Sequence, residues 1–432
     1  MRLPLRAFPP VGLHSRSSEP AAAGPDPDTP IILATGVAHL LDHSYLLLYP
    51  ALLVLLQREF GLGLFSLGII ANLHYLASGA GALPAGWVAD RIGAIATIRT
   101  FLLGSSASLL LLALSPTPVL LATWLICLGA FCSLYHPAGL TVLSLRTLRM
   151  GRALGLHGVI GNIGIALTPA VAVTLAQAAG WRWCCVIFAV PGMVAGWGLP
   201  ALAGPQPIAP GGPAAPAAPC AGAGFASASP GSSIRWRPLV FLYLAVTLTG
   251  FVYSGVMTFL PARFALGNGS GRLTAAGAVT SLALLVGMAG QYVGGNLSQR
   301  FPPALLFATL MGLSTPCLAL VADGRIGVAA AASAGFSFFH FASQPVSNGY
   351  LARWVPAHRR SLGYGVYFTL SFGVGSFAAA AAGYVAEHWG LPRVFPFLSV
   401  AALAAGLVMA GTLTRASSPA ENAPGAPRAW PS

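Results

Sequence analysis

The sequence predicts an all-α integral membrane protein with twelve transmembrane helices in two six-helix halves and with both termini in the cytoplasm. Three observations predict this fold class. The chain of 432 residues is 56% hydrophobic and only 7% charged, with a mean hydropathy of +0.76, and a soluble protein of this composition would need an unusually large core. Apolar runs of roughly 20 residues recur along the chain, and a helix needs this length to cross a bilayer. The two halves of the chain also match each other.

The apolar runs give the predicted spans and the domain organisation. We expect residues 1–30 to be a disordered cytoplasmic tail, because they hold no apolar signal-peptide core, and residues 414–432 to be a second tail. A Pro-, Ala- and Gly-rich stretch at 204–237 is typical of a flexible linker between an N-terminal half, 31–203, and a C-terminal half, 238–413. The predicted spans are residues 31–56, 65–89, 95–114, 118–145, 153–178, 183–203, 238–262, 273–297, 303–322, 326–351, 360–386 and 392–413.

The basic residues predict the orientation. All 22 are arginines, and most of them fall in loops on the side of the membrane that holds both termini. Because positively charged loops stay in the cytoplasm, this bias predicts that both termini are cytoplasmic. We expect a multi-pass protein of the plasma (inner) membrane. The same placement argues against nucleic acid as the partner of this chain, despite its net charge of +13. The six cysteines form no CxxC pair and are expected to be packing residues.

An internal repeat predicts the plan of a transporter. Pro137 and Pro345 are separated by 208 residues, as are Arg152 and Arg360, and several further pairs share this spacing. Two parallel six-helix halves place a substrate site at their interface, near the middle of the membrane. The third, sixth, ninth and twelfth spans hold almost no ionisable residues, so we expect them to be outer scaffold while the other spans surround a polar path.

The stretch GWVADRIG, from Gly86 to Gly93, resembles the G-x-L-A-D-R-x-G loop motif of the major facilitator superfamily, which lies between its second and third spans. The segments AHLLDHSYLLLYPALL, SLYHPAG and GLHGVIGNIG look like the fosmidomycin-resistance branch of that superfamily. This resemblance implies an exporter of small hydrophilic drugs or organic anions that is driven by the proton gradient. Two features depart from the pattern: Ala94 and Ile95 replace the basic pair that ends the loop motif, and the fifth span lacks the full glycine–proline motif of many drug/proton antiporters.

A polar cluster in the first span is the leading candidate site. His39, Asp42 and His43 are spaced i, i+3 and i+4, so they project from one face of a helix within a single turn. A carboxylate at this depth is either neutral or held by a nearby cation, and imidazoles titrate near physiological pH. We predict that these three residues couple transport to protons. The alternative is an ion pair that only fixes helix packing.

Polar residues in other spans are candidates for substrate binding. His136 precedes Pro137 and Gln344 precedes Pro345, and a proline can bend a helix and free carbonyl groups to line a cavity. The alternative at both places is a structural kink. The predicted substrate-binding residues are His136, Gln344, Tyr49, His340, Asn348 and Asn162.

The loop motif supplies candidate gating residues. By the resemblance, Asp90 and Arg91 form a latch with the start of the eleventh span, near Arg359 and Arg360, and such a contact combines helix-dipole and charge-assisted interactions. The alternative is solvated surface charge that only sets topology. The predicted gating residues are Gly86, Asp90, Arg91, Gly93, Arg359 and Arg360.

Together these features predict a secondary active transporter that works by alternating access and exports a small drug or organic anion in exchange for protons. The alternative within transport is a proton-coupled importer or a facilitator of a small organic solute. A non-transporting sensor and a metal-dependent intramembrane enzyme are weaker alternatives, since the sequence holds no HExxH motif. We expect no enzymatic activity, cofactor or metal, and a monomer whose partners are a small-molecule substrate, protons and the lipid bilayer.

Overall fold

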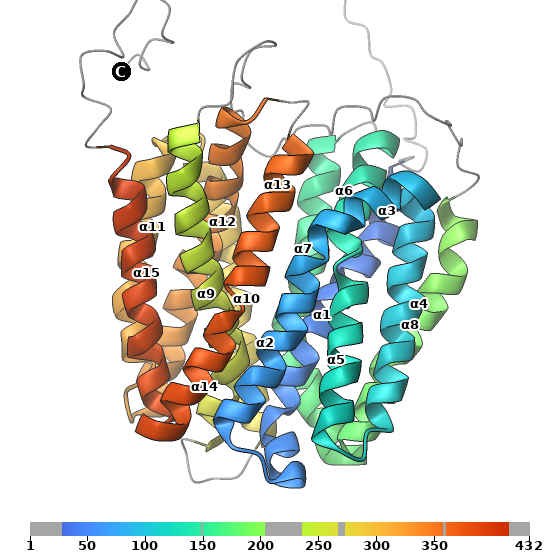
Figure 1. The fold of residues 1–432 in the computed structure, drawn as a ribbon. Coiled ribbons are helices and arrows are strands. Elements are labelled where there is room, and N and C mark those ends of the chain that lie inside the picture. The colour runs from blue at the N-terminus through green and yellow to red at the C-terminus, as the bar shows by residue number, and fades with distance from the viewer. Residues whose placement is uncertain (1–27, 148–149, 204–235, 267–272, 357–359, 414–432) are drawn as a thin grey trace, which may run out of the picture.

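The computed structural model describes residues 28–147, 150–203, 236–266, 273–356 and 360–413, and these are helical apart from short turns (Figure 1). In chain order the helices are α1 (Thr29–Phe60), α2 (Leu64–Ala80), α3 (Ala82–Ile92), α4 (Ala94–Ala113), α5 (Pro118–Cys132), α6 (Tyr135–Arg146), α7 (Met150–Ala179), α8 (Trp181–Ala203), α9 (Trp236–Leu266), α10 (Leu273–Leu297), α11 (Pro303–Leu320), α12 (Ile326–Trp354), α13 (Arg360–Phe368), α14 (Phe377–Trp389) and α15 (Val394–Ala410). A π-helical turn, η2 (Thr369–Val374), joins α13 to α14, and a 3₁₀ turn, η3 (Leu391–Arg393), precedes α15.

These helices make the twelve spans that the sequence predicts. Eleven segments of the described chain are long and apolar enough to cross a membrane, and the pair α2 and α3, bent by 45°, makes a twelfth. Two spans are composite, because α5 joins α6 and because α13, η2 and α14 run on from one another. Because the number of spans is even, the start of α1 and the end of α15 lie on the same side of the membrane. The assignment of that side to the cytoplasm stays a prediction.

The two equivalent prolines act differently. The fourth span breaks between α5 and α6 at Ser133, the residue whose carbonyl would have bonded to the missing N–H of Pro137. In contrast, α12 continues through Pro345 without interruption. On either side of this proline, the hydroxyls of Ser343 and Ser347 donate to the carbonyls of His340 and Gln344, at 2.7 and 2.9 Å.

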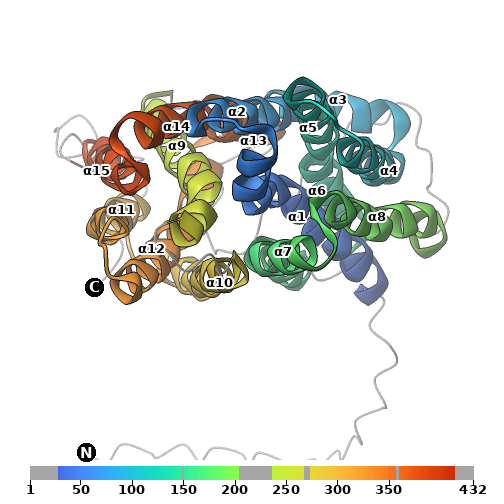
Figure 2. The same cartoon turned by 90° about the horizontal axis from the view of Figure 1, so that it is seen from below.

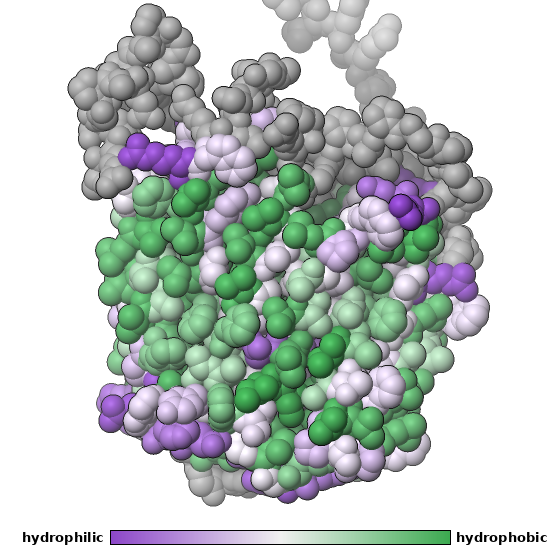
Figure 3. All heavy atoms as spheres, viewed as in Figure 1, coloured by the Kyte–Doolittle hydropathy of each residue, from purple (hydrophilic) through white to green (hydrophobic). Residues whose placement is uncertain are grey.

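The helices form two groups side by side, seen along the helix axes in Figure 2. Helices α4 and α8 lie at one outer edge and α11 and α15 at the other, which confirms that the third, sixth, ninth and twelfth spans are peripheral. The surface in Figure 3 is mostly hydrophobic along the middle of the bundle, and hydrophilic residues gather at its two ends. This distribution fits a protein that is surrounded by lipid.

The two halves meet through small residues. Helix α7 packs on α10, and α2 packs on α14, at glycines that let backbones approach closely. A Cβ atom on Gly68 would lie 2.3 Å from the carbonyl oxygen of Ala379, and one on Gly277 would lie 2.7 Å from that of Pro169. Only glycine fits at such positions, so the halves form a close backbone contact there.

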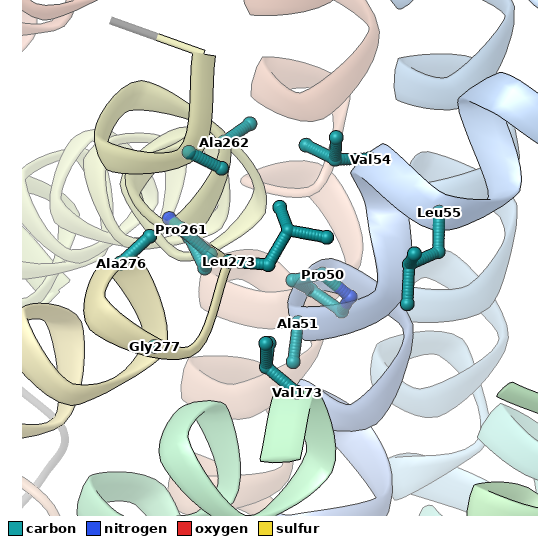
Figure 4. A pocket seen from close by; sticks show the side chains of 11 residues that line it. Pro50, Ala51, Val54, Leu55, Val173, Pro261, Ala262, Leu273, Ala276 and Gly277 are labelled. Atoms are coloured by element: carbon teal, nitrogen blue, oxygen red, sulfur yellow. The ribbon is translucent and has the colours of Figure 1, made fainter. Parts of the chain in front are cut away.

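This contact is tight toward one end of the bundle, which we call the Glu387 end; the opposite end, with α3 and the start of α13, is the Asp90 end (Figure 1). Near the Glu387 end, Pro50 and Ala51 of α1 face Pro261 of α9 and Leu273 of α10 (Figure 4). The gap that these apolar residues line has a volume of about 10 Å³, room for roughly one water molecule. The halves are therefore closed to solutes at the Glu387 end.

Glycine packing inside the C-terminal half gives a stability prediction. A Cβ atom on Gly290 of α10 would lie 2.0 Å from the carbonyl oxygen of Phe338 in α12. We expect Gly290→Val to cost about 1–3 kcal/mol and to lower the apparent unfolding temperature in detergent by several degrees. Gly312→Val in α11 is the matched control, because a Cβ atom there meets open space. Equal unfolding temperatures for the two variants would contradict this packing.

Candidate functional site

The centre of the N-terminal half holds a buried carboxylate. Asp42, in the middle of α1, has no exposed surface, and its Oδ2 lies 3.3 Å from Nε2 of His136, at the start of α6. No other ion pair of Asp42 occurs among the described residues, and neither of its oxygens has a partner with good hydrogen-bond geometry. The side chain of His136 is 26% exposed, against 1% for Asp42. The imidazole therefore lies between the buried carboxylate and an accessible surface.

Three further imidazoles complete the cluster. The ring centre of His39 lies 4.6 Å from that of His43, 5.3 Å from that of His136 and 4.3 Å from that of His157 in α7. The carbonyl of His157 lies 3.1 Å from Nδ1 of His39, so this nitrogen carries the proton and Nε2 keeps its lone pair. A Cβ atom on Gly161 would lie 2.2 Å from the same Nδ1, so glycine is needed for this approach of α7 to α1.

Tyr135 connects the three helices of the cluster. Its hydroxyl is fully buried, donates to the carbonyl of Thr35 in α1 at 2.7 Å, and accepts from Nε2 of His157 at 3.3 Å. Neither Tyr135 nor His157 was among the residues predicted for the site. For Tyr135, the signal in the sequence was the Tyr-His-Pro step itself, because the helix breaks near Pro137 and the side chains of Tyr135 and His136 both contact α1.

The cluster can hold protons, and its imidazoles can also approach one metal ion. Three ring nitrogens lie within 4.8 Å of one another, one each from His39, His43 and His136. Imidazole nitrogens bind divalent transition metals at about 2.1 Å, so such an ion would have to draw the rings closer together.

The structure distributes the other predicted substrate contacts over both halves. Asn162 of α7 donates to Gln291 of α10, so this amide bridges the halves. Tyr49 is buried, and its hydroxyl donates to the carbonyl of Leu67 at 2.8 Å, which ties α1 to α2. His340 is buried in α12, and its Nδ1 has no hydrogen-bond partner among the described residues.

The remaining two predicted contacts lie in the second half of α12. Tyr364 of α13 donates to the backbone carbonyl of Asn348 at 3.0 Å, and the side-chain oxygen of Asn348 has no partner within the described part of the chain. Gln344 is half-buried, and its carbonyl accepts from Ser347. The ring that contacts His136 from the C-terminal half is that of Phe368, with ring centres 5.7 Å apart, and a role for Gln344 opposite His136 stays a prediction.

Two overlapping segments, residues 34–341 and 270–432, match the Major Facilitator Superfamily. The chain belongs to this superfamily. It is 27% identical over 143 residues to the uncharacterized MFS-type transporter YfnC of Bacillus subtilis (strain 168). That match covers 33% of this chain and 35% of the relative, so it spans about a third of the relative's length.

Solved structures support the same fold. A bacterial homologue of the human lysosomal transporter Spinster, in an inward-facing and occupied conformation, superposes with a TM-score of 0.70, at 13% identity, over 91% of this chain and 96% of that one. The human organic anion transporter MFSD10 gives a TM-score of 0.65, at 18% identity, over 89% and 99% of the two chains. At these identities the likeness shows the fold.

The loop motif of this superfamily member has a defined shape. Gly93 caps α3 with φ of +86°, a conformation that favours glycine. Arg91 lies over the ring of Trp87 at 3.9 Å, and Asp90 is exposed. A Cβ atom on Gly86 would meet open space. The predicted partners of this loop cannot be placed, because Arg359 and the side chain of Arg360 lie outside the described residues.

Tyr135 gives a prediction for the stability of the cluster. Tyr135→Phe removes the donor to Thr35 and the acceptor of His157, so buried polar groups lose partners. We expect a cost of about 1–3 kcal/mol, measured as a lower apparent unfolding temperature in detergent. Tyr292→Phe, at a residue that is 75% exposed, is the control. Unchanged stability of Tyr135→Phe would show that these hydrogen bonds do not hold α6 and α7 on α1.

Proposed function

We propose that this chain is a secondary active transporter that works by alternating access and exports a small drug or organic anion from the cell in exchange for protons. Asp42, His39 and His43 couple transport to protons, and His136 relays protons between Asp42 and the accessible surface. The chain acts in the plasma membrane, with both termini in the cytoplasm, the orientation that its arginine pattern predicts. Its resemblance to the fosmidomycin-resistance branch supports export, and the name of MFSD10 as an organic anion transporter supports the substrate class.

The observation that carries this proposal is the position of Asp42. The chain has nine acidic residues, and four of them lie within described helices. Three of these four, Glu59, Asp90 and Glu387, lie within about a turn of a helix end, and Asp42 alone lies mid-helix. A carboxylate in the membrane interior is costly and is therefore kept for function. The imidazole of His136, 3.3 Å from this carboxylate, can also take the proton.

The proposed cycle uses Asp42 as the group that carries the proton. Asp42 takes up a proton while the site is open to the outside and releases it to the cytoplasm after the halves have rearranged, as substrate moves the other way. One proton that crosses with the field gains about 2.3 kcal/mol per 100 mV. Coupling requires that protonation changes the affinity for substrate, and a site beside the interface between halves can meet this requirement. Import or facilitated flow through the same path remains the alternative.

Replacement of Asp42 tests the proposal. In proteoliposomes with a pH-sensitive dye inside, phosphonates and small organic anions are added in turn to the wild type and to Asp42→Asn. We expect one class of solute to drive proton movement in the wild type and the variant to lose at least about nine-tenths of it, because an amide cannot carry the proton.

Asp323→Asn is the matched control. Asp323 lies in the loop before α12, where hydrogen bonds from Arg325 lower its pKa to about 2, so it stays ionised throughout the assay. Solute flux without proton movement, unchanged in Asp42→Asn, would make the protein a facilitator and Asp42 a packing residue. A metal chelator should leave proton movement unchanged; its loss on chelation would favour a metal site.

A second prediction concerns closure at the Glu387 end. Glu387 of α14 accepts a hydrogen bond at 2.9 Å from the backbone N–H of Phe65, in the first turn of α2, and so links the halves at a helix N-terminus. We expect Glu387→Ala to raise about two- to fivefold the rate at which an impermeant maleimide labels Ala51→Cys, which lines the closed gap.

The control is Glu59→Ala at the same end. The carboxylate of Glu59 contacts Trp181 and Arg182 of its own half, so its loss leaves the contact between halves intact. Equal labelling of Ala51→Cys in the two backgrounds would show that Glu387 does not hold this end closed.

A further inference from the structure

The eleventh span contains the one π-helical turn of the described chain. In η2 the N–H of Gly375 donates to the carbonyl of Leu370, five residues earlier, at 3.0 Å. A π turn holds one more residue than the α-helix around it and is less stable, and such turns are frequent at functional sites. Since the turn lies midway along the span, it sets the rotation of α13 relative to α14.

This turn touches both halves of the molecule. Toward the N-terminal half, Thr369 donates to the carbonyl of Gly79 at 3.2 Å, and Ser376, just after the turn, donates to the side chain of Asn72 at 3.1 Å. Toward its own half, the carbonyl of Ser371 lies so close to α9 that a Cβ atom on Gly250 would be 2.0 Å from it. A change of register in η2 therefore alters contacts on both sides at once.

A line of aromatic rings runs from the proton site through this turn. Phe368, the last residue of α13, stacks on His136 with an angle of 10° between the rings. Phe372 stacks on Phe368 at 6.0 Å and 9°, and the edge of Tyr253 of α9 meets Phe372 at 5.8 Å. Tyr253 in turn stacks on His340, with ring centres 6.1 Å apart. The line thus joins His136, which contacts Asp42, to the buried His340 of α12 in the C-terminal half.

The line offers a physical route for coupling. The face of a benzene ring attracts a cationic imidazolium more than a neutral imidazole, and a His136 that turns toward or away from Asp42 must slide on Phe368. The groups around His136 that can exchange protons with it are Asp42, His39 and His43 of α1, Tyr135 of α6 and His157 of α7. Loss of the extra residue in η2 would rotate α13 by about 100° and shift it by about 1.5 Å, which separates Phe368 from His136.

We propose that Phe368 is the coupling residue between the two halves: its ring senses the Asp42–His136 contact, and the π turn Thr369–Val374 is the two-state element that converts a change there into movement of the C-terminal half. This inference rests on the proposed proton-coupled function. It assigns to Phe368 a positioning role, since the residue holds His136 and carries no proton itself.

The test measures protons moved per solute in the same proteoliposomes. Phe368→Leu keeps an apolar side chain without the ring face, Phe368→Tyr keeps the ring, and Phe377→Leu is the control at a residue that is 53% exposed. We expect the ratio to fall about fivefold or more in Phe368→Leu, with solute flux retained, and to stay at the wild-type value in the other two. A merely structural role would lower solute flux and proton flux together.

Deletion of Leu370 is an independent variant, because it removes the extra residue and should convert η2 to an α-helix. With a normal elution profile in detergent, this variant should keep binding the solute and lose coupled proton movement. A wild-type ratio in both Phe368→Leu and the deletion variant would overturn the inference and leave the proposed function intact. A wild type that moves solute without protons would overturn both.

Discussion

A carboxylate in the interior of a membrane protein needs a partner, and the contact between Asp42 and His136 meets this need. Several features of the N-terminal half hold these two residues in contact. The break in the fourth span before Pro137 places His136 beside Asp42 of α1. Gly161 lets α7 approach α1 closely enough for the carbonyl of His157 to contact His39. Tyr135 ties α1, α6 and α7 together around the pair. The cluster is thus built on three helices whose positions depend on one another.

The interface between halves has a different character, suited to a contact that must open and close. It combines close backbone contacts at glycines, such as Gly68 and Gly277, with apolar side chains such as Pro50 and Leu273. Its few polar contacts, such as Asn162 with Gln291 and Glu387 with the first turn of α2, are single hydrogen bonds that water can replace. Rigid halves with a lightly bonded interface are what alternating access requires.

The two kinds of contact meet at the end of α13. His136 belongs to the histidine cluster around Asp42, whereas Phe368 precedes the one π-helical turn of the described chain. A π turn is less stable than the α-helix on either side of it, which is why we propose this segment as the element that transmits a local change at His136. The proposed coupling therefore depends on the contact between His136 and Phe368, which are distant in the sequence.

The sequence by itself determined the class and the span plan. Apolar length and the constant offset between halves are local or periodic properties, and they predicted the twelve spans. The near absence of ionisable residues from every third span predicted its peripheral position. Helical spacing likewise placed His39, Asp42 and His43 together, because residues three and four apart share a face.

Only the tertiary structure decided which other residues join this face. The positions of His136, Tyr135 and His157 around Asp42, the bridge from Asn162 to Gln291 and the π turn before α14 depend on how the helices pack and where each of them breaks. The same proline motif breaks one span and leaves its counterpart continuous, so the proline alone does not decide where a helix breaks. Sequence periodicity determines which residues share one face of a helix. Which helix packs against that face is decided by contacts between segments that are distant in the sequence.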